Sequence, residues 1–238
     1  MHPRKDAKVG KVTLDTPMAE SPETSQEAIS AMRRSYGEVG ITENTMNPDP
    51  IAQFSLWLRE AAANYMIIEA NAMVLSTIGQ DGPSSRTVLL KDVDQNGFTF
   101  FTNYQSDKSR QIQSNPKVSL LFPWYPMERQ VIVIGSASRI EEAESARYFA
   151  TRPWSSQIGA LASNQSEVID SRQVLEQRFK ELSEKYPQGS TVPKPDNWGG
   201  YLVKPSSIEF WQGRYSRLHD RLRFSLSGSN WKLERLSP

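Results

Sequence analysis

The chain has 238 residues, no cysteine and only two histidines. Without cysteine it has no disulfides, no thiol catalysis and no zinc–thiolate site, and with two histidines we expect no metal site. Its 28 Lys and Arg residues nearly balance 27 Asp and Glu residues, which argues against a general nucleic-acid-binding protein. No apolar run resembles a membrane span or a signal peptide, so we expect a cytoplasmic protein that binds neither membranes nor nucleic acids.

The first part of the chain divides into a tail and a helix. Residues 1–30 are polar and lack aromatic side chains, so we expect them to be mostly disordered. Asp49-Pro50 predicts the start of a helix, with Asp as the N-cap and Pro in the first turn. Residues at helical spacing after it are expected to face the core: Ile51, Phe54, Leu58, Ala61 and Tyr65.

Strand-like patterns dominate the rest of the chain. The strands are expected at 72–78, 85–93, 98–102, 117–122, 130–138, 200–203, 208–211, 222–226 and 231–236. Asn96-Gly97 predicts a tight hairpin between two of them. Helices are expected at 106–114, 141–151, 155–161 and 171–186. Many short strands joined by hairpins predict a mainly β fold with inserted helices, either a barrel or a sandwich.

Three stretches combine cations and hydroxyls at the ends of expected elements. Residues 86–91 form a strand with a cation at each end, residues 101–108 lead into a helix that begins beside Lys108, and residues 148–157 bring a phenol, a guanidinium and hydroxyls together. Such groups bind phosphate well, especially at a helix N-terminus. Each stretch also has an ordinary explanation, namely an edge strand, a helix cap or a surface arginine.

A fourth polar cluster lies near the C-terminus, where Arg217-Leu218-His219-Asp220-Arg221 follows Trp211-Gln212-Gly213. Paired guanidiniums beside an imidazole suit an anionic or heteroaromatic ligand. A solvated hairpin with local ion pairs explains the cluster equally well. Together the four stretches indicate two anionic ligands, or one large one, on a β-rich scaffold.

From about Met32 to Pro238 the chain resembles the pyridoxamine 5′-phosphate oxidase family, also called pyridoxine 5′-phosphate oxidase. The resemblance is carried by many segments in order. They are residues 69–73, 86–91, 100–103, 129–131, 152–160, 164–166, 198–201, 209–213, 217–221 and 231–238. The resemblance implies a homodimer with an FMN-binding split β-barrel fold and FMN at the subunit interface. Residues 31–196 would then form the FMN-binding domain, and residues 197–238 would complete the barrel, the active site and the dimer interface.

The resemblance implies that pyridoxamine or pyridoxine 5′-phosphate is oxidised to pyridoxal 5′-phosphate, with O2 as acceptor and H2O2 as product. The alternatives are another FMN split-barrel oxidoreductase or a non-catalytic protein that binds flavin or vitamin B6 phosphates. The implied FMN contacts are Arg86, Thr87, Val88, Leu89, Phe101, Thr102, Lys108, Gln130, Gln165, Ser166, Trp211 and Arg221. The implied substrate contacts are Lys91, Tyr148, Arg152, Ser156, Arg217, Leu218, His219, Arg33 and Tyr36, with Arg217 and His219 as the catalytic pair.

One residue departs from the family pattern. Asp107 stands where the family commonly has an arginine that helps to hold the FMN phosphate. We expect Asp107 to face solvent and to favour the helix N-terminus through the helix dipole, so that FMN has one contact fewer. Arg110 is a candidate replacement cation.

Overall fold

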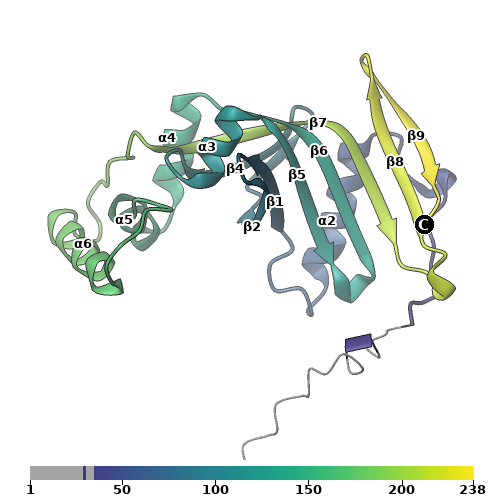
Figure 1. Ribbon diagram of the computed structural model, residues 1–238, viewed down its shortest axis with the longest axis horizontal. Helices are drawn as coiled ribbons and strands as arrows, with labels where there is room; N and C mark the ends of the chain where they lie inside the picture. Colours follow the sequence, from purple (N-terminus) through teal and green to yellow (C-terminus); the bar gives the residue numbers. More distant parts are fainter. Residues whose placement is uncertain (1–28, 31–34) are drawn as a thin grey trace, which may run out of the picture. The chain divides into compact units, whose positions relative to one another are not determined.

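An antiparallel sheet of nine strands organises residues 36–238 in the computed structural model, which describes residues 29–30 and 35–238 (Figure 1). The strands are β1 (Ala72–Gly79), β2 (Gly82–Leu89), β3 (Asp92–Asp94), β4 (Gly97–Asn103), β5 (Lys117–Trp124), β6 (Arg129–Arg139), β7 (Trp198–Gln212), β8 (Asp220–Ser227) and β9 (Asn230–Leu236). Seven of them follow the order β2-β1-β5-β6-β7-β4-β3, while β8 pairs with β7 and β9 pairs with β8. The predicted mainly β class with inserted helices is confirmed.

Residues 1–35 form a separate unit, in which Ile29 and Ser30 are helical. The predicted disorder of residues 1–30 therefore falls almost entirely outside the described residues. The substrate contact predicted for Arg33 also lies outside them. Among the described residues, no helix is long and apolar enough to cross a membrane.

Helix α2 (Pro50–Ala63) begins as its sequence predicts. The Asp49 carboxylate accepts a hydrogen bond from the Ile51 N–H at 2.9 Å, and Pro50 occupies the first turn. Phe54 is fully buried, with its ring centroid 4.9 Å from that of Phe98 and 4.8 Å from that of Phe122. Tyr65 was expected to face the core, but it is 93% exposed because the helix ends at Ala63.

The core lies between α2 and the inward faces of the strands. In β5 every second residue is buried, so one face lies in the core and the other is at least partly exposed. The remaining helices are α3 (Asp107–Ser114), α4 (Glu142–Thr151), α5 (Trp154–Ala162) and α6 (Arg172–Lys185), with 3-10 turns η1 (Glu43–Thr45), η2 (Tyr125–Met127) and η3 (Tyr215–Arg217). A smaller cluster around Phe149, Ile158 and Trp198 joins α4, α5 and α6 to the start of β7.

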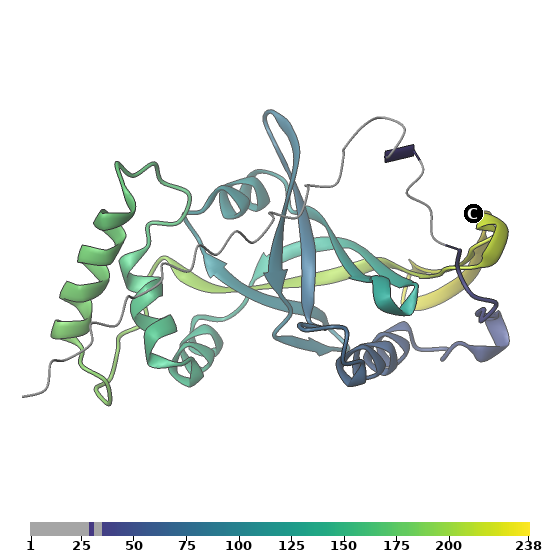
Figure 2. The same ribbon diagram turned by 90° about the horizontal axis from the view of Figure 1, so that it is seen from below.

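Strand β7 connects the two ends of this unit. The first part of β7 pairs with β4, the last part pairs with β8, and β6 pairs along the other edge. Its 15 residues span roughly 45 Å at most, at about 3.3 Å per residue. Figures 1 and 2 accordingly show α4, α5 and α6 at one end of the unit and the β8–β9 ribbon at the other.

Two strand predictions were wrong. The single strand expected over 85–93 is two strands, β2 and β3, with Leu90 and Lys91 between them. The two strands expected over 200–203 and 208–211 are one strand, because the register with β6 shifts between Ile134 and Gly135 and accommodates Pro205. A side chain at Gly135 would lie 2.4 Å from the Lys204 carbonyl oxygen, so glycine permits this close approach.

Candidate functional site

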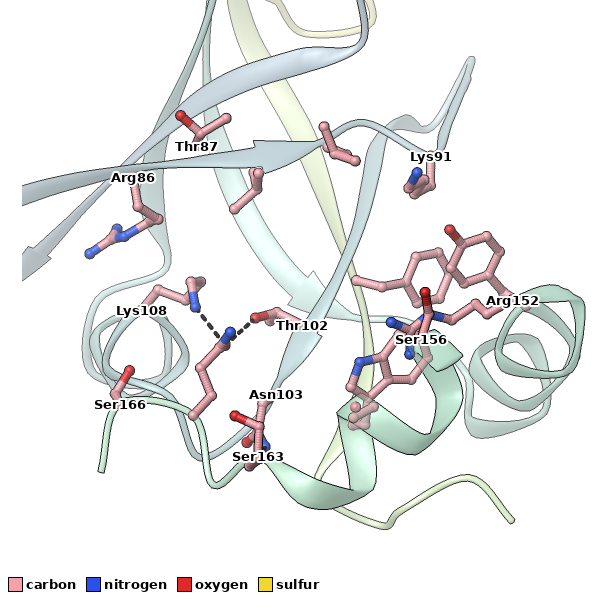
Figure 3. A pocket seen from close by; sticks show the side chains of 18 of the residues that line it. Arg86, Thr87, Lys91, Thr102, Asn103, Lys108, Arg152, Ser156, Ser163 and Ser166 are labelled. Carbon is pink, nitrogen blue, oxygen red and sulfur yellow. Dashed lines mark hydrogen bonds between the residues drawn. The ribbon is translucent and has the colours of Figure 1, made fainter. Parts of the chain in front are cut away.

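A cavity of about 1070 Å³ opens where β2, β4, α3, α4 and α5 meet. Among the described residues, four cations line it, Arg86, Lys91, Lys108 and Arg152, against a single carboxylate, Asp107. Figure 3 shows them as two groups, with Arg86 and Lys108 at one end and Lys91 and Arg152 at the other. The cavity therefore suits an elongated ligand, or two ligands, with negative charge at both ends.

The first end is built from the N-terminus of α3 and from β2. Lys108 is only 8% exposed, although its side chain is charged. Burial, and to a lesser extent the neighbouring charge of Arg86, lowers the pKa of Lys108 to about 8. Burial also lowers the pKa of Arg86. A phosphate between these two cations would relieve both costs, so this end fits the phosphate of FMN.

The loop after α5 closes the same end. The Gln165 side-chain oxygen accepts hydrogen bonds from Lys108 Nζ at 2.8 Å and from the Thr102 hydroxyl at 3.1 Å (Figure 3). Ser166 has a left-handed backbone with φ of 75°, and its hydroxyl accepts the Asp107 N–H at 3.2 Å. Gln165 and Ser166, 57 or more residues after Lys108 in the chain, thus lie beside it.

Helix α3 begins differently from the simple capped helix that its sequence allowed. Ser106 precedes the helix, but its hydroxyl donates to the Asn103 carbonyl and does not cap the helix. Asp107 is exposed and forms an ion pair with Arg110, as expected for a carboxylate that faces solvent at a helix N-terminus. Because Arg110 is held by Asp107 and does not line the cavity, the expectation that it replaces the missing cation was wrong.

The second end is built from α4, α5 and the start of β7. Tyr148 and Arg152, one helical turn apart, both line the cavity together with Ser156. The Arg152 guanidinium lies 4.7 Å from the centroid of the Trp198 ring, and its buried Nη1 has no hydrogen-bond partner among the described residues. Burial lowers the pKa of Arg152. A half-buried guanidinium with a buried, unused donor is poised to bind an anion.

Between the two ends lies a wall of strand backbone and aromatic rings. Residues Thr87, Val88 and Leu89 of β2 form part of it. The Phe101 ring stacks on Tyr148 at 3.9 Å between centroids and on Trp198 at 5.3 Å. This flat wall between two cationic ends can receive a planar ring system.

The remaining predicted residues lie elsewhere, at the end of β7. Gln130 pairs in register with Trp211, and Trp211 pairs with Arg221. The ring of Tyr36 meets His219 edge-on at 5.3 Å and Trp211 at 5.8 Å. None of these residues lines the cavity. Strand β7 runs between them and Trp198, and within this chain the predicted contacts do not all come together at the cavity.

Within the polar cluster, residues 217–219 form a turn, and Asp220 and Arg221 begin β8. Ser216 and Arg217 both have positive φ, 54° and 61°, which places Arg217 in η3 and His219 in the following turn. Arg217 and Leu218 are exposed, whereas Nδ1 of His219 accepts the Arg214 N–H at 3.1 Å. Left-handed non-glycine residues are costly and often occur at functional sites.

The other two charged residues of the cluster are paired. Arg221 binds the Glu209 carboxylate through two nitrogens, at 2.7 and 3.1 Å. Asp220 contacts Arg235 at 2.6 Å and Arg214 at 3.6 Å, so it holds two neighbouring cations.

Two residues that shape the cavity, Trp198 and Gln111, were not predicted from the sequence. Trp198 supports Arg152 and Phe101, and Gln111 contacts Arg86. The Trp198-Gly199-Gly200-Tyr201 segment was conspicuous in the sequence, yet nothing in it indicated which ring or cation the tryptophan would contact. Gln111 gave no signal, because its role depends on the packing of α3 against the β1–β2 hairpin.

The fold and the cavity define a class of protein, the split-barrel proteins with a cationic site for phosphorylated planar ligands. The family model described as "Pyridoxamine 5'-phosphate oxidase" matches residues 59–186. The model "Pyridoxine 5'-phosphate oxidase C-terminal dimerisation region" matches residues 198–238. The chain belongs to the pyridoxamine 5′-phosphate oxidase family, and it carries the dimerisation region of that family.

Individual relatives agree with this assignment. A pyridoxine/pyridoxamine 5′-phosphate oxidase of Rubrobacter xylanophilus is 51% identical over 91% of this chain and 100% of its own. The crystal structure of PhzG from Burkholderia lata, in complex with tetrahydrophenazine-1-carboxylic acid, is 30% identical with a TM-score of 0.78 over 85% of this chain and 99% of that one. An FMN-binding protein of Nostoc punctiforme shares the fold, with 15% identity and a TM-score of 0.64 over 81% of this chain and 100% of that one.

Proposed function

We propose that this protein is an FMN-dependent oxidase that converts pyridoxamine 5′-phosphate and pyridoxine 5′-phosphate to pyridoxal 5′-phosphate. The alcohol reacts with O2 to give the aldehyde and H2O2. The amine reacts with O2 and water to give the aldehyde, ammonia and H2O2. Membership of the family and the names of the 51% identical relatives support this reaction.

One observation carries the proposal, which is that the cavity has two separate cationic ends. Arg86 and Lys108 suit the FMN phosphate, and the buried, unpaired Nη1 of Arg152 suits the substrate phosphate together with Lys91, Tyr148 and Ser156. Thr87, Val88, Leu89, Phe101, Thr102, Gln165 and Ser166 would complete the FMN contacts on this side. When bound, FMN supplies a ring that accepts a hydride from the substrate and passes the electrons to O2.

The residues at the end of β7 would face the reacting ring of the substrate. Arg217 and His219 would orient the pyridine ring and stabilise its charge as the hydride leaves. The hydrogen bond from the Arg214 N–H to His219 Nδ1 places the proton of a neutral imidazole on Nε2, which is then the donor toward the substrate. Tyr36 would limit the motion of His219 by its edge-on contact, and Gln130, Trp211 and Arg221 would contact FMN.

The length of β7 supports the inference that these residues come from a second copy of the chain. A symmetric dimer would bring the cavity of one chain to the Arg217–His219 turn of its partner, and it would form two complete sites. The dimerisation region at residues 198–238 includes this turn. The site is incomplete in one chain, which agrees with FMN binding at a subunit interface.

A second candidate function is an FMN oxidoreductase with a carboxylate substrate, because PhzG of Burkholderia lata binds tetrahydrophenazine-1-carboxylic acid. The four donor groups at this end, Lys91, Tyr148, Arg152 and Ser156, favour a phosphate instead. A phosphate dianion accepts more hydrogen bonds than a carboxylate does.

Peroxide release decides between these functions. The purified protein loaded with FMN should release H2O2 with pyridoxine 5′-phosphate and with pyridoxamine 5′-phosphate, and much more slowly with unphosphorylated pyridoxine. Equal rates with and without the phosphate, or no peroxide at all, would contradict the proposal. A flavin spectrum without any turnover would instead indicate a non-catalytic flavin-binding protein.

A further inference from the structure

The guanidinium of Arg86 lines the cavity, and a network of hydrogen bonds with β1, β2 and α3 fixes its position. Nη1 of Arg86 donates to the Thr77 hydroxyl and to the Leu75 and Ser84 carbonyl oxygens. Nη2 donates to the Ser84 hydroxyl at 2.7 Å and to Gln111 Oε1 at 3.2 Å. These hydrogen bonds use both Nη1 and Nη2, and among the described residues they do not involve the Nε–H of Arg86.

Gln111 is the centre of this network. Its single Oε1 accepts the Thr77 hydroxyl at 2.5 Å and the Ser84 hydroxyl at 3.0 Å, besides Nη2 of Arg86. Each hydroxyl in turn accepts from Arg86, so hydrogen bonds join the four side chains in one closed network. Thr77 is 1% exposed, and an unmatched hydroxyl there would be costly.

The network also joins two elements of the cavity. Gln111 and Lys108 are three residues apart on α3, on neighbouring positions of the helix surface. Gln111 reaches the β1–β2 hairpin, which carries Arg86, while Lys108 lines the cavity. A side chain at Gly79 would lie 2.8 Å from Gln111 Nε2, so the glycine at the end of β1 leaves room for this amide.

We propose that Gln111 is a positioning residue that holds the Arg86 guanidinium beside Lys108. In this way Gln111 sets the affinity of the protein for the phosphate of FMN. This inference rests on the proposed function, because it takes FMN as the ligand. Without Gln111 Oε1, the two hydroxyls and Nη2 of Arg86 lose their shared acceptor. The guanidinium then samples other positions, and the phosphate loses a preorganised cation.

Two flavins separate this role from a general structural one. FMN and riboflavin share the ring, but riboflavin lacks the phosphate. Gln111→Met keeps the side-chain length and removes the acceptor. We expect it to weaken FMN binding by about tenfold, as for the loss of one charged hydrogen bond, while riboflavin binding changes by less than about twofold. The affinities are measured on the apoprotein by quenching of flavin fluorescence.

Gln113→Met is the matched control, because Gln113 lies on the same helix and donates to the Tyr104 carbonyl, away from Arg86. It should leave both affinities unchanged. Thr77→Val is a second variant of similar volume that removes a hydroxyl bonded to both Gln111 and Arg86, and it should weaken FMN selectively even where Gln111→Met folds poorly.

The inference is overturned if Gln111→Met leaves the FMN affinity within twofold of the wild type. If Gln111→Met does not fold, the same result for Thr77→Val overturns it. It is equally overturned where FMN and riboflavin weaken to the same extent. Wild-type protein that binds no FMN would overturn the proposed function itself, which is a different result.

Discussion

The two ends of β7 treat their cations in opposite ways. At the cavity end, Lys108 is buried and Arg152 is half-buried without an anion, and burial lowers the pKa of both. Near Gln212, Arg221 binds Glu209 and Arg235 binds Asp220 and Glu43. Burying a charge without a partner is costly, so we expect a bound ligand to compensate the unpaired cations of the cavity. Paired cations instead hold the turn at residues 214–220 in shape.

The contrast between the two ends of β7 would lose its meaning if both ends belonged to one active site within a single chain. Heterodimers of Arg152→Ala and Arg217→Ala chains test this most directly. Each homodimer should be nearly inactive at low substrate concentration. The purified heterodimer should recover about half of the wild-type rate, because one of its two sites combines two unaltered halves.

A heterodimer of Arg152→Ala and Lys91→Ala chains is the control. Both changes lie at the cavity end, so each of its two sites carries one damaged residue and no recovery is expected. No recovery in the first heterodimer would mean that Arg152 and Arg217 serve a site in the same chain. Recovery in the control would mean that Arg152 and Lys91 of one chain do not serve the same site.

The two ends should also differ in which kinetic constant they control. Arg152→Ala removes a contact to the remote phosphate and should raise KM roughly 10- to 100-fold with a smaller effect on kcat. Arg217→Ala should lower kcat more than Arg152→Ala does, because Arg217 acts on the reacting ring. Steady-state kinetics with pyridoxine 5′-phosphate measure both, and the reverse pattern would contradict these roles.

The unpaired state of Lys108 predicts a pH dependence of FMN binding. Its pKa is lowered to about 8, so the amine is charged below that pH and neutral above it. FMN affinity should therefore fall as pH rises above about 8, and binding near this pH should take up a proton. Fluorescence titrations across this range test it, and Lys108→Arg should remove most of the pH dependence because arginine stays charged.

The same shift has the opposite sign for the stability of the apoprotein. Lys108 in the fold binds its proton less tightly than in the unfolded chain, whose ordinary lysine pKa is 10.5. The unfolded state therefore carries more protons between about pH 8 and 10.5, and the contribution of Lys108 to stability rises with pH there. Denaturant unfolding of apoprotein and FMN-bound protein should show these opposite trends, and parallel trends would contradict them.

Asp107 gives the smallest expected effect, because it is exposed and already paired with Arg110. Asp107→Arg should raise FMN affinity by a few-fold through added positive charge near the phosphate end, more at low salt than at high salt. Asp107→Asn separates removal of the negative charge from the added cation. Unchanged or weaker FMN binding in Asp107→Arg would show that the aspartate costs the protein nothing.

Local signals in the sequence predicted the parts of the fold that depend on local chemistry. Asp49-Pro50 predicted the start of α2, and Asn96-Gly97 predicted the turn between β3 and β4. The continuity of β7 was not predictable, because Pro205 ends a strand in most contexts and is tolerated here only through the register shift opposite Gly135. That compensation lies about 70 residues away in the chain, where local patterns carry no information.

The candidate site shows the same limit. The cations and hydroxyls at the ends of β2, α3 and α4 could be found from the sequence, and the cavity brings them together. Arg217 and His219 follow Trp198 by only about 20 residues, so the sequence suggested that they lie close to it. It could not reveal that one continuous strand, β7, separates them. Nor could it reveal the positions of Gln111 and Trp198, which depend on contacts between elements.

The length of β7 also links cofactor binding to assembly. If each complete site needs the cavity of one chain and the turn of another, FMN contacts both chains at once and binds the dimer more tightly than the monomer. By thermodynamic reciprocity, FMN then strengthens the association of the chains to the same degree. Activity per chain should therefore fall on dilution below the dimer dissociation constant, and added FMN should shift that fall to lower protein concentration.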